Sequence, residues 1–182
     1  MKVVGFTFIR NAIAYDYPIA EAIQSIQPLC DEVVVAIGKS DDATMELVRQ
    51  LEGNLTIVET TWDDTLREGG RVLALETDKA LAAVPQDADW CIYIQGDEVM
   101  HEDGHAAIRQ AMAACLPDER IDGLLLKYRH FYGSYDYVGT SSKWYKHEIR
   151  VIRNGRGIFS YRDAKGFRKR PNQKLRLARV ND

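Results

Sequence analysis

The chain has 182 residues, of which 46% are apolar and 28% charged, and its net charge is −3. This composition is typical of a soluble globular domain and excludes a disordered or fibrous protein. The apolar runs are too short to span a bilayer, and the N-terminus lacks the apolar core of a signal peptide. Three widely spaced cysteines form no CxxC pair, so we expect free thiols in a cytoplasmic protein.

Charge is unevenly distributed along the chain. Residues 1–142 hold 11 Lys and Arg against 24 Asp and Glu, whereas residues 143–182 hold 13 against 3. A basic end on an acidic body favours an anionic partner, such as a phosphate group or an acidic lipid surface. The alternative is a solvated basic face whose charges pair with the acidic body.

Strands and helices are expected to alternate through the first half of the chain. Short β-branched and aromatic runs predict strands, and apolar side chains at helical spacing predict the helices between them. The predicted strands are 2–9, 32–37, 55–60 and 90–94, and the predicted helices are 19–29, 43–51 and 71–84. Beyond them we expect a helix at 102–114, a strand at 123–128, an aromatic loop or hairpin at 130–139 and a half-exposed edge strand at 146–153.

This order predicts an α/β fold with a mostly parallel central sheet and helices on both faces. A ligand then binds beyond the carboxyl ends of the strands, where polar segments follow each strand. Those segments are residues 10–11, 39–42, 62–71 and 95–98. We expect residues 1–160 to form one domain. Residues 161–182 are expected to be a basic segment, disordered in part or cut short from a longer chain.

Two adjacent carboxylates, Asp97 and Glu98, follow the apolar strand at 90–94. A carboxylate at this place suits a hard cation such as Mg²⁺ or Mn²⁺, which needs few protein oxygens when a diphosphate supplies the rest. Adjacent residues of an extended chain point in different directions, so we expect one to face the site and the other its flank. The plain alternative is an ordinary Gly-Asp turn at the end of a strand.

Several segments resemble, in the same order, the motifs of family 2 glycosyltransferases. They are Thr7–Asn11, Ser40–Thr44, Gly70–Glu76, Tyr93–Glu98 and Glu148–Asn154. The resemblance implies a GT-A fold, with a Rossmann-like nucleotide-sugar-binding half and a short acceptor region. It also implies a transferase that moves a sugar from a nucleotide-diphosphate donor to an acceptor with the help of a divalent metal, Mn or Mg.

The resemblance also assigns roles to residues. The nucleotide-sugar would contact Thr7, Arg10, Asn11, Arg71 and Gln95, and the metal would be held by Asp97, Glu98 and His147. Gln95 stands where the first Asp of the family's Asp-x-Asp motif would be, so Asp97 keeps the motif's remaining carboxylate. The acidic residue that reads the base in the family is replaced by Ile37 or Gly38.

The general base is expected to be Asp163, the lone acid of a basic stretch, with Asp136 in the aromatic loop as the alternative. The plain readings are a salt-bridge acid for Asp163, a surface arginine for Arg71 and a capped loop for Arg10 and Asn11. The aromatic residues of the same region would stack on sugar rings.

Two other functions remain open from the sequence. One is a nucleotide- or nucleic-acid-binding module without catalysis. The other is a nucleotidyltransferase, although the segment 7–17 has no glycine for a phosphate loop. For a glycosyltransferase we expect no nucleic-acid partner. The acceptor would be anionic or lipid-linked, and the basic end would attach the protein peripherally to the inner membrane face.

Overall fold

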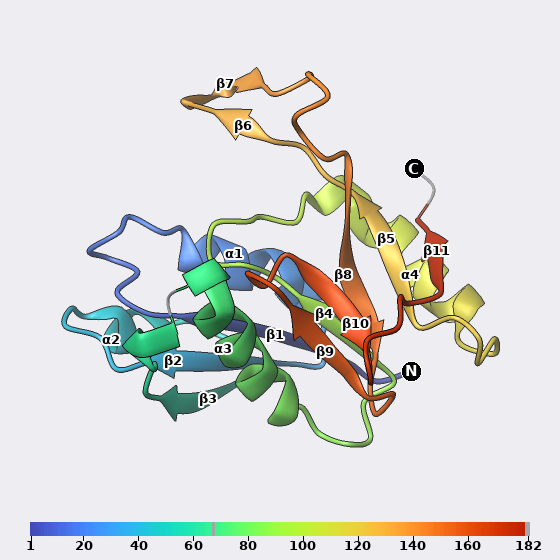
Figure 1. Cartoon of the computed structure of the whole chain (residues 1–182), viewed down its shortest axis with the longest axis horizontal. Helices are drawn as coiled ribbons and strands as arrows, with labels where there is room; N and C mark the ends of the chain where they lie inside the picture. The colour runs from blue at the N-terminus through green and yellow to red at the C-terminus, as the bar shows by residue number, and fades with distance from the viewer. Residues whose placement is uncertain (67, 181–182) are drawn as a thin grey trace.

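A seven-stranded sheet forms the centre of the computed structural model, which describes residues 1–66 and 68–180 (Figure 1). The strand order is β11-β5-β8-β4-β1-β2-β3. The strands are β1 (Val3–Ile9), β2 (Glu32–Gly38), β3 (Leu55–Thr60), β4 (Trp90–Tyr93), β5 (Gly123–Lys127), β8 (His147–Arg153) and β11 (Leu177–Arg179). The helices are α1 (Ile19–Ile26), α2 (Thr44–Arg49), α3 (Arg71–Ala82) and α4 (His105–Cys115).

The predicted fold class is confirmed. Strands β3, β2, β1 and β4 are parallel neighbours, and β5 pairs with β11 in parallel, while β8 runs antiparallel between β4 and β5. Because β1 to β4 are joined through helices, their carboxyl ends lie at one edge of the sheet, as the predicted order requires.

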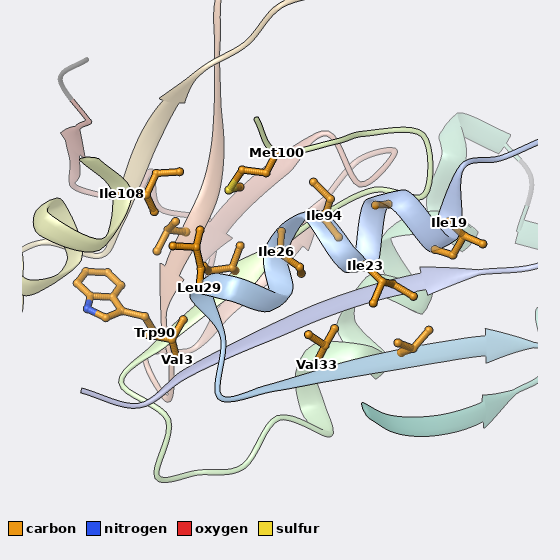
Figure 2. Packing of buried hydrophobic residues seen from close by; sticks show 14 of the residues in the cluster. Val3, Ile19, Ile23, Ile26, Leu29, Val33, Trp90, Ile94, Met100 and Ile108 are labelled. Carbon is orange, nitrogen blue, oxygen red and sulfur yellow. The ribbon is translucent and has the colours of Figure 1, made fainter. Parts of the chain in front are cut away.

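Two apolar cores cover the two faces of the sheet. On one face, Ile19, Ile23 and Ile26 of α1 pack with side chains of β1, β2 and α4 (Figure 2). On the other face, Phe6 and other alternate residues of β1 pack against α3. Side chains alternate along a strand, so a strand buried on both faces is apolar throughout, which is why β1 and β2 read as continuous apolar runs.

The prediction of a half-exposed edge strand at 146–153 is wrong. β8 lies inside the sheet, and its Arg150 and Arg153 are buried. Arg153 donates hydrogen bonds to the carbonyl oxygens of Cys115 and Leu116, both at 2.8 Å, and lies over the Trp90 ring. The alternation of charged and aliphatic residues therefore marks buried, hydrogen-bonded arginines and not a solvated face.

Residues 161–180 belong to the fold, so a separate and partly disordered segment beginning at residue 161 is not what the structure contains. Strands β9 (Ile158–Tyr161) and β10 (Gly166–Lys169) form a hairpin over the α3 face, and β11 extends the sheet. Phe167 anchors the hairpin because its ring meets Tyr93 edge-on at 5.3 Å, within the core. Residues 181–182 lie outside the described residues.

The aromatic segment at 130–139 forms a hairpin of β6 (Phe131–Tyr132) and β7 (Ser134–Val138), which projects away from the sheet as an arm (Figure 1). The three cysteines are free thiols, as expected, and burial raises the pKa of the Cys91 thiol to about 12. Within residues 1–66 and 68–180, no helix is long and apolar enough to cross a membrane.

Candidate functional site

The loops that follow β1 and β2 are joined by hydrogen bonds into one surface at the carboxyl edge of the sheet. The Asn11 N–H donates to the Ser40 hydroxyl at 3.0 Å, and the Asp41 N–H donates to the Asn11 side-chain oxygen at 2.8 Å. Asn11 adopts a left-handed conformation, with φ of 53°, which asparagine tolerates better than most residues. Its side-chain oxygen therefore braces the two loops, and its amide NH₂ group is what remains for a ligand.

Asp42 strengthens the same connection. Its carboxylate accepts the N–H groups of Ala14 and Thr44 at 2.8 and 3.0 Å, together with the Thr44 hydroxyl. Loss of water on burial would raise the pKa of Asp42, but these hydrogen bonds outweigh it and hold the pKa below its usual value. The Thr44 hydroxyl oxygen also accepts the N–H of Ala12 at 2.7 Å. These bonds hold the two loops in one arrangement.

Arg10 lies at the end of β1 and is held by an aromatic ring and a carboxylate. Its guanidinium sits 5.5 Å from the centre of the Trp62 ring and donates to Asp64 at 3.0 Å. Trp62 covers Gly38 so closely that a Cβ there would lie 2.3 Å from the indole nitrogen. Arg10 is thus fixed beside the loop that follows β3, and its cationic group stays partly exposed.

Thr7 was predicted to contact the nucleotide, but its side chain is not accessible. It lies within β1 opposite Val35, two residues before the strand ends, and it is completely buried. A ligand at the edge of the sheet cannot reach a side chain enclosed in the interior. The first solvent-accessible side chain after β1 is that of Arg10.

Glu98 is also corrected, because its carboxylate is already occupied. Arg150 donates to it twice, from Nε to Oε2 at 2.8 Å and from Nη2 to Oε1, and both side chains are almost fully buried. The Tyr128 hydroxyl donates to Oε1 at 2.7 Å, and the Gln95 N–H donates to Oε2 at 3.1 Å. The rings of Tyr93 and Tyr128 lie 5.5 and 5.6 Å from the guanidinium. Glu98 therefore fastens the loop after β4 and is no metal ligand.

Asp97, by contrast, is exposed on the same loop. Partial loss of water and the neighbouring charge of Glu98 raise the pKa of its carboxyl, although Arg150 acts in the opposite direction. One of the two adjacent acids thus faces outward and the other is buried. In the described part of the chain, no three His, Cys, Asp or Glu side chains converge into a complete metal site. Asp97 fits a cation that takes most of its oxygens from a bound diphosphate.

Arg71 begins α3 after two glycines in left-handed conformation, Gly69 and Gly70, with φ of 62° and 68°. The turn between β9 and β10 is seated on this point, since a Cβ on Gly70 would lie 2.5 Å from the Asp163 Cβ. The Gln95 side chain donates to the Ala164 carbonyl of the same turn at 3.3 Å. The structure thus brings Arg71, Gln95 and Asp163 together around the N-terminus of a twelve-residue helix, where free N–H groups favour anions.

His147 begins β8 and pairs with Lys127 at the end of β5. Because β8 is antiparallel to β4, its first residue lies at the same edge as the loop that carries Asp97. Among the residues that the structure describes, no hydrogen bond or ion pair joins His147 to Asp97. Its role as a metal ligand stays a prediction.

The arm leaves the body between β5 and β8, beside the same edge. Its large side chains are exposed, from 44% for Val138 to 81% for Tyr135. Asp136, the alternative base, lies on β7 of this arm and not in the turn against α3. An open groove is lined by Tyr132, Tyr137, Val138, Gly139 and Trp144. Tyr128, however, belongs to the Glu98 network and is not free to stack on a sugar.

Sequence reasoning missed Arg150 and Trp62, which shape the site without being exposed motifs. Arg150 lies 52 residues from Glu98 along the chain. Arg150 lies in the segment Glu148–Asn154 that resembles a family motif, but the alternation of charged and aliphatic residues there has the same form as a solvated edge, so its pairing with Glu98 was not predicted.

Several known protein structures resemble this chain in fold. The crystal structure of residues 1–349 of S. aureus TarS aligns with a TM-score of 0.57 and 18% identity over 85% of this chain and 47% of that one. The same TarS segment in complex with UDP-GlcNAc aligns with a TM-score of 0.54 and 22% identity over 74% of this chain and 36% of that one. The chain therefore has the fold of GT-A glycosyltransferases, and it matches less than half the length of these structures.

A scan of protein-family models gave no match. A search of the curated proteins gave none either.

Proposed function

We propose that this chain binds a nucleotide-diphosphate sugar and, with a divalent Mn or Mg ion, transfers the sugar to an acceptor. The observation that carries the proposal is the grouping at one sheet edge of an exposed carboxylate, Asp97, with Arg71 and the N-terminus of α3. A carboxylate for a cation and a guanidinium with helix N–H groups for phosphates are the two elements that diphosphate binding needs. Similarity in fold to TarS, which has been crystallised with UDP-GlcNAc and with UDP, supports this donor class.

The donor would lie across the two fixed loops. Arg71 and the free N–H groups of α3 would bind the diphosphate, and Asp97 would hold the cation against it. The cation supplies charge that neutralises the leaving diphosphate. Arg10 and the free amide group of Asn11 would bind the nucleoside, and Gln95 would stay in the turn that it already holds through Ala164.

In a single displacement, the acceptor hydroxyl oxygen bonds to the anomeric carbon while the bond from that carbon to the diphosphate oxygen breaks. The diphosphate leaves with the electron pair, and Asp163 accepts the hydroxyl proton. Asp163 is exposed and lies against Gly70, next to Arg71. Its carboxylate would then lie beside the phosphates that the helix would bind, and its contact with Gly70 supports this role. Effective general-base catalysis of this kind contributes about 10²–10⁴-fold to a rate.

A release assay separates this proposal from a binding module. The full chain is screened against UDP-, GDP- and TDP-sugars with Mn²⁺, first by thermal shift and then by release of the nucleoside diphosphate. Asp163→Asn should lower release about 100-fold or more while the thermal shift by the donor persists, because an amide cannot accept the proton. Asp136→Asn is the matched control and should keep wild-type release.

Three results would contradict the proposal. No shift with any sugar nucleotide would remove the donor class. A shift without any release would leave a binding module. Loss of release in Asp136→Asn with retention in Asp163→Asn would move the base to the arm. A lipid-linked acceptor, a cytoplasmic location, peripheral membrane contact and the absence of a nucleic-acid partner stay predictions.

A further inference from the structure

The outward face of the β9–β10 hairpin carries arginines stacked on aromatic rings. The guanidinium groups of Arg162 and Arg168 lie 5.2 and 4.7 Å from the centre of the Tyr161 ring. That of Arg170 lies 5.8 Å from the centre of the Phe159 ring. We call these three arginines and two rings the arginine ladder. The inward face of the same hairpin is buried through other residues, so the ladder faces solvent.

Ion pairs do not neutralise the ladder's charges among the residues that the structure describes, although the Asp78 carboxyl and the Arg170 guanidinium attract each other at longer range. In residues 1–66 and 68–180, none of its three arginines forms an ion pair with a carboxylate. Asp78 lies near Arg170, but its carboxylate accepts the Ser160 N–H at 2.6 Å. The next cation, Lys169, does pair with Asp122 at 2.9 Å. The acidic body therefore pairs with the charge of Lys169, as the alternative for the basic end predicts, but it does not form ion pairs with the arginines of the ladder.

The ladder has a direction and a spacing. Arg162 adjoins Asp163 in the turn at the candidate site, and Arg168 and Arg170 follow toward the opposite end of the hairpin. The Arg170 N–H donates to the Gly157 carbonyl at 2.9 Å, so the extended pairing reaches this residue. Alternate residues of a strand lie about 7 Å apart on one face. Arg168 and Arg170 lie at that interval, and with Arg162 in the turn they form a row of cations that leads away from the site, which matches a ligand with repeated anionic groups.

The covered rings distinguish between anionic polymers. Proteins that bind single-stranded nucleic acid offer free aromatic faces on which bases stack. Here Tyr161 has guanidinium groups of two arginines against it, and Phe159 has a third. The stacked guanidinium groups keep N–H edges for phosphate oxygens and have lost part of their side-chain freedom.

We propose that the arginine ladder binds a linear, phosphate-bearing acceptor and leads it to the turn that holds Asp163. That the bound chain is an acceptor rests on the proposed function. That the ladder binds a phosphate chain depends only on the ladder itself. Each exposed contact between an arginine and a phosphate is weak, so the ladder acts by the number of its contacts and is sensitive to salt.

The experiment measures binding of fluorescently labelled linear polyphosphate to the full chain by anisotropy at several salt concentrations. The test variant is Arg168→Gln with Arg170→Gln, which leaves Arg162 and Asp163 intact. The control variant is Arg49→Gln with Arg109→Gln, two exposed arginines on α2 and α4 that change the net charge equally. A third variant replaces Arg168 and Arg170 with lysine.

We expect the test variant to bind polyphosphate about tenfold more weakly and to lose roughly 1.5 from the slope of log affinity against log salt concentration. The control should stay within about twofold of wild type. The lysine variant should fall between them, because it keeps the charge and loses the planar fork. Equal losses in test and control variants, or wild-type binding by the lysine variant, would overturn the ladder.

Two comparison ligands test the choice of partner. Oligothymidylate and vesicles of phosphatidylglycerol should bind more weakly than polyphosphate of equal charge, and stronger binding of either would overturn the proposal. UDP binding with Mn²⁺ is measured on the same variants and should be unchanged. If wild type binds no UDP, the proposed function fails. The polyphosphate measurement still tests the ladder independently of that result.

Discussion

Replacing Arg150 with methionine should lower the free energy of unfolding by about 3–5 kcal/mol. The change leaves the Glu98 carboxylate buried, and its remaining donors in the described part of the chain are the Tyr128 hydroxyl and the Gln95 N–H. The side chains of Arg150 and Glu98 are 4% and 5% exposed, so water cannot replace the lost guanidinium. Removing one partner of a buried pair costs more than the pair itself contributes, because a charge is left without compensation.

Thermal and urea unfolding, followed by circular dichroism, measure this loss. For a chain of this size, 1 kcal/mol shifts the Tm by about 2–4 °C, so a fall of roughly 6–20 °C is expected. Arg120→Met is the matched control, since it removes an exposed ion pair with Asp118 at 2.8 Å and should cost less than about 1 kcal/mol.

The double variant Glu98→Gln with Arg150→Met separates charge from packing. The double variant removes the Glu98 charge and leaves only the longer Arg150 pairing with Glu148, at 3.7 Å, uncompensated, so it should be more stable than Arg150→Met by at least about 1 kcal/mol. The reasoning is refuted if Arg150→Met costs no more than Arg120→Met, or if the second substitution adds its own loss to the first.

Two further changes test the packing and the charge at the site's edge. Gly70→Ala should lower the free energy of unfolding by about 2–4 kcal/mol and Gly69→Ala by only about 1–2 kcal/mol. Both glycines have positive φ, but only Gly70 lies against Asp163. Equal losses of Tm in the two variants would contradict this explanation. Asp42→Ala should cost about 2 kcal/mol at pH 7, since hydrogen bonds to a carboxylate are lost. The folded pKa of Asp42 is below its unfolded value of about 3.9, so its contribution is present above that pH and is lost as the pH falls through the folded pKa. In urea unfolding, the difference in unfolding free energy between wild type and Asp42→Ala should decrease from pH 7 to pH 3. A difference that stays constant would contradict the lowered pKa of Asp42.

The middle of the sheet could be predicted from the sequence because β1, β2 and β4 are buried on both faces and read as nearly uninterrupted apolar runs. The alternation with helices indicated a mostly parallel sheet, and this placed the site at the carboxyl edge before any side chain was known. The loop with Asp97 could be found for the same reason, since polar residues directly after a buried strand mark that edge.

What the sequence could not reveal were contacts between distant segments. The pairing of Glu98 with Arg150 joins the loop after β4 to β8, which lie far apart in the sequence, and a lone arginine in a strand has the same pattern whether buried or exposed. Thr7 was wrongly predicted to contact the nucleotide because it lies two residues before the end of β1. At that position the sequence does not distinguish a buried threonine from an exposed one. The order of residues 161–180 depends on Phe167, whose partners lie on β1 and β4.

The central claim is that Asp97 holds a divalent cation against a nucleoside diphosphate, and isothermal titration of UDP tests it most directly. Wild type and the control Asp103→Asn, an exposed acid on the following segment, should bind UDP at least about tenfold more tightly with Mn²⁺ than with a chelator. Asp97→Asn should bind UDP equally weakly in both conditions, because an amide oxygen carries no charge. Equal Mn²⁺ dependence in wild type and Asp97→Asn would contradict the claim.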